Sequence, residues 1–182
     1  MGNMLIRCLF SLLLFVPMVV MANPAWVLVD TQNQTVSVLQ AGQTVLQLKG
    51  AAFGRGGVSD VRLRGDGRTP LGSFHVVSIN RNSPYHLYFG LNYPTIEQAA
   101  AGYVQGLIDK VDFDEIVQAI TEGRVPPQDT PLGGNIGIHG VGNGSLKVHQ
   151  RFNWTQGCVA LTNAQIEQLA TWLEIGTRVV IQ

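Results

Sequence analysis

Short runs of β-branched residues, separated by glycine- and proline-containing turns, constrain the fold of this chain more than any other feature. Three such runs follow one another at 25–30, 34–39 and 43–49, and a turn at Asn33 joins the first two into a hairpin. Further strands are expected at 73–79, 85–91, 135–139, 145–149 and 177–181. The 21 glycines among 182 residues also fit a turn-rich β protein better than a helical bundle. The sequence therefore predicts a mainly β fold.

Helical periodicity interrupts the strand pattern in two places. Apolar residues recur at helical spacing within 95–124 and predict two short helices, at about 95–109 and 112–122. This helical insertion either covers a cleft as a lid or only packs against the β framework. One C-terminal helix is predicted at 163–174, with a capping-box pattern that begins at Thr162.

Residues 1–22 have the pattern of a secretory signal peptide. Arg7 precedes an apolar run that ends in small residues at Ala22. The competing interpretation is an uncleaved membrane anchor, but the run is shorter than the ~20 residues that span a bilayer, and Pro17 interrupts it. We therefore expect cleavage after Ala22 and export to the periplasm, with membrane contact only through the signal peptide.

After cleavage, the chain 23–182 keeps one cysteine, Cys158. A lone thiol in an exported protein has no partner for an internal disulfide, so it is either a buried inert side chain or a reactive one. The 12 basic and 12 acidic residues of the whole chain balance, which removes the basic excess expected of a nucleic-acid binder. We expect no nucleic-acid partner.

The segment 136–163 contains the residues that suggest chemistry. A cysteine nucleophile needs a base to take its proton and backbone donors to stabilise the oxyanion. His139 stands at the end of a predicted strand, where its side chain can project into a cleft toward Cys158. Gly157 allows close backbone approach to a substrate, and the amide groups around Cys158 are candidate oxyanion donors.

These motifs resemble those of a known family. The pair 139–140 (His-Gly) and the run 155–158 (Thr-Gln-Gly-Cys) are similar to the catalytic motif of the L,D-transpeptidase (YkuD-type) family. The stretches 65–74 (GDGRTPLGSF) and 176–181 (GTRVVI) extend the resemblance over most of the chain. It implies that 23–182 is one catalytic domain, a YkuD-like β-sandwich or barrel that requires no metal and no organic cofactor.

The residues after Cys158 resemble one branch of that family. Many members carry a hydrophobic residue and then Arg or Asn, whereas this chain continues Val-Ala-Leu-Thr-Asn. This departure is similar to the branch with the pattern GC-x-A-x-T, which includes proteins that detach a lipoprotein from peptidoglycan. The absence of the Arg puts in doubt any substrate contact that this Arg makes elsewhere in the family.

The resemblance implies a reaction and its participants. Cys158 would attack the carbonyl at the L-centre of meso-diaminopimelate in a peptidoglycan tetrapeptide stem, forming a thioester for transfer to an amine acceptor. His139 would accept the thiol proton, and the Gly140 carbonyl would orient its imidazole. With water as the acceptor the protein would be a hydrolase, either an L,D-carboxypeptidase or an amidase that releases a peptidoglycan-linked lipoprotein. A non-catalytic peptidoglycan-binding module is the alternative from another class.

Four more residues are expected around the site as substrate-binding candidates. Thr155 belongs to the motif itself, and Trp154 is expected to form a wall beside Cys158. Tyr93, which precedes a proline, is expected either to form a turn or to shape the pocket. His149 either lines the cleft or makes a structural hydrogen bond.

Overall fold

The computed structural model describes residues 23–182, and the predicted signal peptide lies outside the described residues. Within that range, eight strands form one mixed sheet. These strands are β1 (Trp26–Asp30), β2 (Thr35–Gln40), β3 (Gln43–Lys49), β6 (Gly72–Ser83), β7 (His86–Leu91), β8 (Gly137–His139), β9 (Val159–Ala160) and β10 (Arg178–Ile181). Their order across the sheet is β3-β2-β1-β10-β6-β7-β8-β9. The short strands β4 (Val58–Ser59) and β5 (Thr69–Pro70) pair separately.

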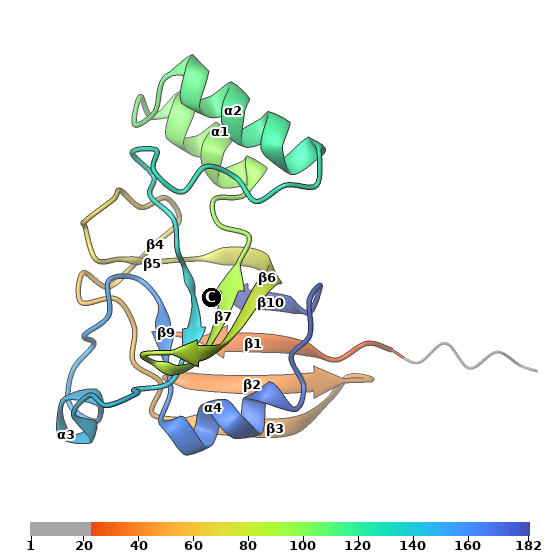
Figure 1. Cartoon of the computed structure of the whole chain (residues 1–182), viewed down its shortest axis with the longest axis vertical. Coiled ribbons are helices and arrows are strands. Elements are labelled where there is room, and N and C mark those ends of the chain that lie inside the picture. The colour runs from red at the N-terminus through yellow and green to blue at the C-terminus, as the bar shows by residue number, and fades with distance from the viewer. Residues whose placement is uncertain (1–22) are drawn as a thin grey trace, which may run out of the picture.

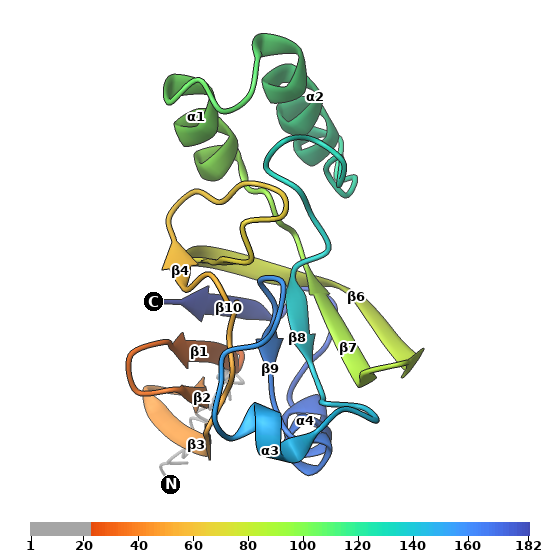
Figure 2. The same cartoon turned by 90° about the vertical axis from the view of Figure 1, so that its left-hand side faces the viewer.

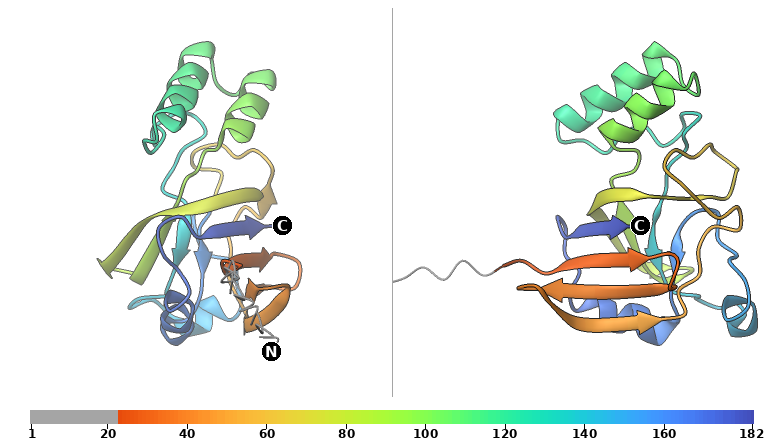
Figure 3. Two further views of the ribbon diagram at one scale, coloured as in Figure 1. Left: turned by 90° about the vertical axis from the view of Figure 1, so that its right-hand side faces the viewer. Right: turned by 180° about the vertical axis from the view of Figure 1, so that it is seen from behind.

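The sheet curls until its two ends meet. The first three strands lie side by side as antiparallel neighbours (Figure 3). Just beyond β3, Ala52 exchanges two backbone hydrogen bonds with Ala160 of β9, at 3.0 and 2.8 Å. The main apolar core lies inside this curled sheet and includes Phe74, Phe89 and Leu169. The prediction of a mainly β fold is confirmed.

Four helices accompany the sheet in the described part of the chain. They are α1 (Ile96–Val104), α2 (Lys110–Thr121), α3 (Leu146–His149) and α4 (Asn163–Ala170). The pair α1 and α2 lies at one end of the molecule, and α3 and α4 lie at the opposite end (Figures 1 and 2). None of these helices has the length and apolar character needed to cross a bilayer.

Helices form at the predicted positions, but some of their ends differ from the prediction. The capping box predicted at Thr162 is present, because Thr162 accepts from the Gln165 N–H and Gln165 reaches back to the Thr162 N–H. However, α1 and α4 both end several residues before the predicted C-termini. The strand predicted at 145–149 is wrong, since the segment forms α3, whose Ser145 hydroxyl accepts from the Val148 N–H. Five residues are too few for periodicity to separate a strand from a helical turn.

The insertion has a small core of its own. Buried side chains from α1, the α1–α2 connection, α2 and the returning loop meet there, namely Ala99, Ile108, Ile116 and Leu132. Hydrogen bonds join this unit to segments that flank the sheet strands: Gln98 Nε2 donates to the Leu71 carbonyl, just before β6, at 3.0 Å, and the Tyr93 hydroxyl, just after β7, donates to the Leu132 carbonyl at 3.1 Å. The insertion is therefore packed against the framework rather than tethered loosely to it.

Candidate active site

The parallel pairing of β8 with β9 brings His139 and Cys158 together. Ile138 pairs with Val159 and His139 pairs with Ala160. Because side chains alternate along a strand, Cys158, two residues before Ala160, projects on the same side as His139. Both line a cavity of about 460 Å³. Its lining residues are Tyr85, Tyr88, Asn135, His139, Trp154, Thr155, Gln156 and Cys158.

The imidazole of His139 is held in one orientation. Its Nδ1 lies 2.7 Å from the Gly140 carbonyl oxygen. A carbonyl only accepts, so Nδ1 carries the proton and Nε2 keeps its lone pair for a second partner. The ring is buried, and burial lowers the pKa of His139, against a raising effect from the Gly140 bond and a further lowering from His149. The imidazole is therefore a neutral base with its free nitrogen available.

Aromatic rings surround this imidazole. The ring centroid of Tyr85 lies 4.4 Å from that of His139, and Trp154 meets it edge-on at 5.8 Å. Tyr88 is the strand partner of His139 across β7 and β8. Burial and the nearby Cys158 both raise the pKa of Tyr88, so its side chain stays a phenol. The rings leave His139 little exposed to water.

Cys158 is a half-buried thiol beside that base. Its Sγ donates to the Asn135 carbonyl at 3.4 Å. Burial raises the pKa of Cys158 to about 11, although the Gly137 N–H and the positive charge of Arg62 act to lower it. The resting pair is therefore a thiol and a neutral imidazole, an arrangement that can generate a thiolate if the proton moves to His139.

A hydrogen-bonded turn positions Cys158. The Thr155 hydroxyl donates to the Cys158 carbonyl at 2.7 Å and accepts from the Gly157 N–H at 3.1 Å. Gly157 has φ 128°, and a Cβ there would lie 2.6 Å from the Arg68 carbonyl oxygen. This position therefore requires glycine.

Of two predictions for the turn, one stays a prediction and one needs correction. The Thr155 hydroxyl is buried and bonded within the turn, although Thr155 also lines the cavity, and its contact with substrate stays a prediction. The Gly157 N–H donates to that same hydroxyl, so it is not a free oxyanion donor. The contribution of Gly157 is instead the backbone conformation that precedes Cys158.

Comparison with known proteins identifies the family of this chain. The family model YkuD, described as an L,D-transpeptidase catalytic domain, matches residues 24–181. The chain belongs to the YkuD L,D-transpeptidase family. A comparison with curated proteins finds no significant match.

Solved structures confirm the YkuD-like fold. The helical cell shape determining protein Pgp2 from Campylobacter jejuni has a TM-score of 0.58 and 22% identity, covering 89% of this chain and 48% of its own. Bd1075 from Bdellovibrio bacteriovorus has a TM-score of 0.57 and 19% identity, covering 88% of this chain and 48% of its own. The L,D-transpeptidase LdtMt1, solved in complex with imipenem, has a TM-score of 0.50 and 14% identity, covering 88% of this chain and 59% of its own. This chain thus spans about half the length of the first two.

Trp154 lines the same cavity as Cys158, as the sequence predicts, and its substrate contact stays a prediction. His149 lines a different cavity, of about 420 Å³, and its Nδ1 accepts from Trp154 Nε1 at 3.3 Å. Of the two alternatives for His149, the structure has the hydrogen bond. Tyr93 is fully buried in the core, so the expectation that it contacts substrate is wrong.

Four residues at or behind the YkuD site are not among those that the sequence predicts: Tyr85, Tyr88, Asn135 and Arg62. Tyr88 could be found from the strand pattern, since pairing the predicted strands 85–91 and 135–139 places an aromatic residue opposite His139. Asn135 acts through its carbonyl, and Arg62 approaches only through tertiary packing, so neither leaves a local signal. In residues 23–182, no group of three or more His, Cys, Asp or Glu side chains is placed to hold a metal ion.

Proposed function

We propose that this YkuD domain is a peptidoglycan L,D-transpeptidase that works through a thioester on Cys158. The observation that carries the proposal is the pairing of Cys158 with His139 on one face of the β8–β9 pair, with the imidazole held by Gly140. The substrate is a stem tetrapeptide, attacked at the L-centre of meso-diaminopimelate. Membership of the family supports peptidoglycan as the substrate.

The geometry supports a sequence of proton transfers through one nitrogen. His139 Nε2 takes the proton from Cys158, and the sulfur bonds to the substrate carbonyl carbon. The imidazolium then protonates the departing D-alanine amine as the carbon–nitrogen bond breaks, which leaves a thioester. His139, neutral again, takes a proton from the acceptor amine as that amine attacks the thioester and displaces the Cys158 sulfur, and the imidazolium then returns the proton to that sulfur to restore the resting thiol. The Gly140 carbonyl stabilises the imidazolium at each stage.

The oxyanion formed in each attack needs backbone donors. Because the Gly157 N–H is bonded to Thr155, the N–H of Cys158 itself is the remaining candidate at this turn. The turn holds that amide in place through the Thr155 hydroxyl, which donates to the Cys158 carbonyl.

Hydrolysis of the same class of bond is the second candidate function. With water in place of the amine, the thioester yields a shortened stem. The sequence Val-Ala-Leu-Thr-Asn after Cys158 favours a lipoprotein-releasing variant of this reaction, with a peptidoglycan-linked lipoprotein as the partner. The description of the solved relative Pgp2 as a cell-shape determinant places cell shape among the processes to test.

Location follows from the N-terminal pattern. We propose that the chain is exported to the periplasm after cleavage behind Ala22, where peptidoglycan stems are accessible. N-terminal sequencing of protein recovered from the periplasmic fraction tests this proposal. A chain that begins at Asn23 is expected, and a full-length chain in the membrane fraction would contradict it.

A product assay tests the function. Purified protein is incubated with a disaccharide tetrapeptide, and the products are separated and weighed by mass spectrometry, with Cys158→Ala as the control. Cross-linked dimers mean transfer, and monomeric tripeptide with free D-alanine means hydrolysis. Lipoprotein release is tested with sacculi that carry bound lipoprotein. Absence of every product, with no covalent imipenem adduct on Cys158, would identify a binding module instead.

A further inference from the structure

Arg62 is a buried cation that the reaction described above does not use. It lies in the loop between β4 and β5 and is 4% exposed. Its Nε is fully buried and has no hydrogen-bond partner among the described residues. The nearest carboxylate oxygen belongs to Asp66, 3.6 Å from Nε, which is an ion-pair distance but too long for a hydrogen bond. A buried guanidinium whose Nε lacks a hydrogen bond is costly to keep.

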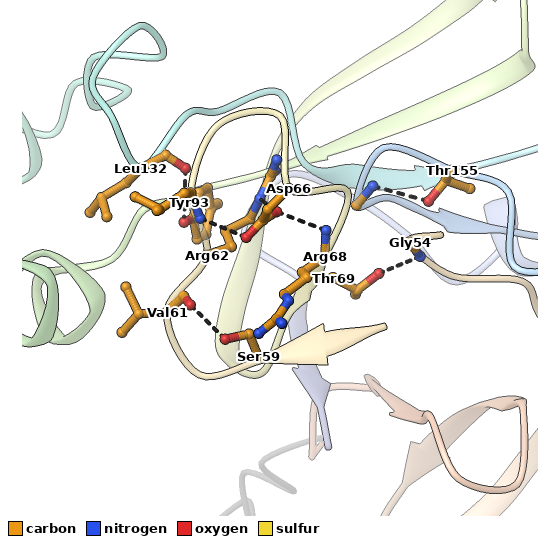
Figure 4. A network of polar contacts seen from close by, with 12 residues as sticks. Gly54, Ser59, Val61, Arg62, Asp66, Arg68, Thr69, Tyr93, Leu132 and Thr155 are labelled. Carbon is orange, nitrogen blue, oxygen red and sulfur yellow. Dashed lines mark hydrogen bonds and ion pairs between the residues drawn. The ribbon is translucent and has the colours of Figure 1, made fainter. Parts of the chain in front are cut away.

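Arg62 lies next to the turn that carries Cys158. Arg62 and Asp66 lie beside Tyr93 (Figure 4), and Arg62 Cζ is 5.9 Å from the centroid of the Tyr93 ring. On another side, Nη1 lies 3.1 Å from the point that a Cβ of Gly157 would occupy. Arg62 is not among the residues that line the cavity. Its charge therefore acts on Cys158 across the peptide backbone and not through a substrate contact.

The other titratable groups that line the Cys158 cavity carry no fixed positive charge, and Arg55 and Arg68, whose backbones contact Thr155 and Gly157, are exposed to solvent. From β8, His139 is neutral at rest, and from β7, Tyr88 is a phenol. His149 of α3 is also buried, which lowers its pKa, and it lies behind Trp154. The loop that carries Arg62 has two acidic residues, Asp60 and Asp66, of which Asp66 lies at ion-pair distance and partly offsets the guanidinium. Arg62 is thus the buried permanent positive charge beside the turn where the Cys158 thiolate develops.

We propose that Arg62 is a positioning residue that stabilises the Cys158 thiolate through its charge, acting across the Gly157 backbone. The same field stabilises the oxyanion formed at the adjacent carbon, and this second effect rests on the proposed function. The effect on the thiol itself does not depend on any substrate.

Alkylation of Cys158 by iodoacetamide, measured against pH, reports the thiolate directly. The full chain is used, and modification is followed on the peptide that contains Cys158, so that Cys8 does not contribute. Arg62→Met is expected to raise the midpoint pH by about one unit and to slow alkylation about tenfold below that midpoint. Arg62→Lys restores most of the rate. Arg64→Met is the matched control: it removes the same charge from an exposed position two residues away and leaves the midpoint unchanged.

Asp66→Asn is expected to shift the midpoint pH of alkylation in the opposite direction. It removes the negative charge beside Arg62, while the asparagine oxygen keeps one of the two bonds that Asp66 accepts from the Leu63 and Arg68 N–H groups. The midpoint is expected to fall, and alkylation at a fixed pH is expected to accelerate about threefold, which corresponds to half a pKa unit. Because this variant keeps Arg62, it tests the proposal even where Arg62→Met fails to fold. A purely structural role would move the melting temperature of both variants and neither midpoint, and that result overturns the proposal.

Turnover measurements separate this inference from the proposed function. Where the disaccharide tetrapeptide is converted, Arg62→Met lowers kcat and leaves KM unchanged, because Arg62 does not touch the substrate. If the wild-type protein converts no stem but the alkylation midpoints shift as expected, the proposed function fails and the role of Arg62 stands. If turnover is present and the midpoints do not move, the role of Arg62 fails and the function stands.

Discussion

The Nδ1 atom of His139 lies 2.7 Å from the carbonyl oxygen of its own neighbour, Gly140. The group that orients the base is therefore part of the same strand end, and no third side chain is needed to set the tautomer. In the Ser-His-Asp arrangement a carboxylate has this role and also stabilises the imidazolium by its charge. The neutral Gly140 carbonyl orients the imidazole but stabilises the imidazolium less than a carboxylate would. The orientation of His139 therefore depends on where the Gly140 carbonyl lies.

Gly140→Ala is expected to lower both stability and turnover. A Cβ at this position would lie 2.7 Å from the Tyr85 carbonyl oxygen and 2.8 Å from Asn163 Oδ1. Such overpacking costs about 1–3 kcal/mol, and it displaces the carbonyl that holds the imidazole. We expect a melting temperature lower by several degrees, seen by circular dichroism, and turnover reduced at least ~10-fold, the rate equivalent of ~1.4 kcal/mol.

Gly123→Ala is the control for Gly140→Ala. Gly123 has φ 70° with no atom within 4 Å of its Cβ position, so alanine there introduces backbone strain far from His139. Comparable destabilisation with normal turnover is expected for this variant. Unchanged turnover in Gly140→Ala would show that the carbonyl does not orient the base.

Thr155→Val removes a hydroxyl that makes two hydrogen bonds within the turn. The variant leaves the Cys158 carbonyl and the Gly157 N–H without their partner, and a buried unsatisfied polar group costs about 1–3 kcal/mol. We expect a clear loss of thermal stability and slower imipenem acylation of Cys158, measured by intact mass. Thr171→Val, which removes an exposed hydroxyl bonded only to the Gln168 carbonyl, should change neither. Equal behaviour of the two variants would contradict the account of the turn.

The pH profile follows from a neutral resting pair. His139 must be unprotonated to accept the thiol proton, and burial keeps the pKa of His139 below its usual 6.5. The value of kcat/KM should therefore be steady near neutral pH and fall only as the pH drops through that lowered pKa. Initial rates on the disaccharide tetrapeptide between pH 4.5 and 8 check this. An acidic limb centred above pH 7 is incompatible with His139 as the neutral base.

Two fully buried isoleucines, one in each apolar core, allow the insertion and the β framework to be tested separately. Ile116 belongs to the small core of α1 and α2, and Ile166 belongs to the main core, next to Gly140. Either change to alanine costs about 2–5 kcal/mol of local packing. Ile116→Ala should expose the insertion to proteolysis while Cys158 still reacts with imipenem, whereas Ile166→Ala should slow that reaction. Loss of reactivity in Ile116→Ala would instead support a lid.

The parts of this molecule that local patterns specify are the ones that the sequence predicts well. Alternating β-branched residues mark the hairpin strands, and the Thr162 capping box depends on residues three positions apart. His139 and Cys158 are predicted because their neighbours form recognisable motifs, although the parallel pairing that joins them is a long-range contact.

The errors arise where distant packing decides. Tyr93 stands beside a proline that suggests an exposed turn, yet the loop that carries Leu132 returns to cover it. The Gly157 N–H is a different case, because a local hydrogen bond to the Thr155 hydroxyl within the same turn occupies it. Arg62 resembles any loop arginine until the fold places it behind Gly157.

The most direct test is to trap the covalent intermediate. Wild-type protein mixed with disaccharide tetrapeptide is quenched in acid within the first turnovers, digested, and analysed by mass spectrometry at the peptide that contains Cys158. The account predicts a thioester on Cys158 that carries the stem without its terminal D-alanine, cleaved by hydroxylamine and absent from Cys158→Ala. Product formation at the wild-type rate by Cys158→Ala, with no adduct on either protein, would contradict it.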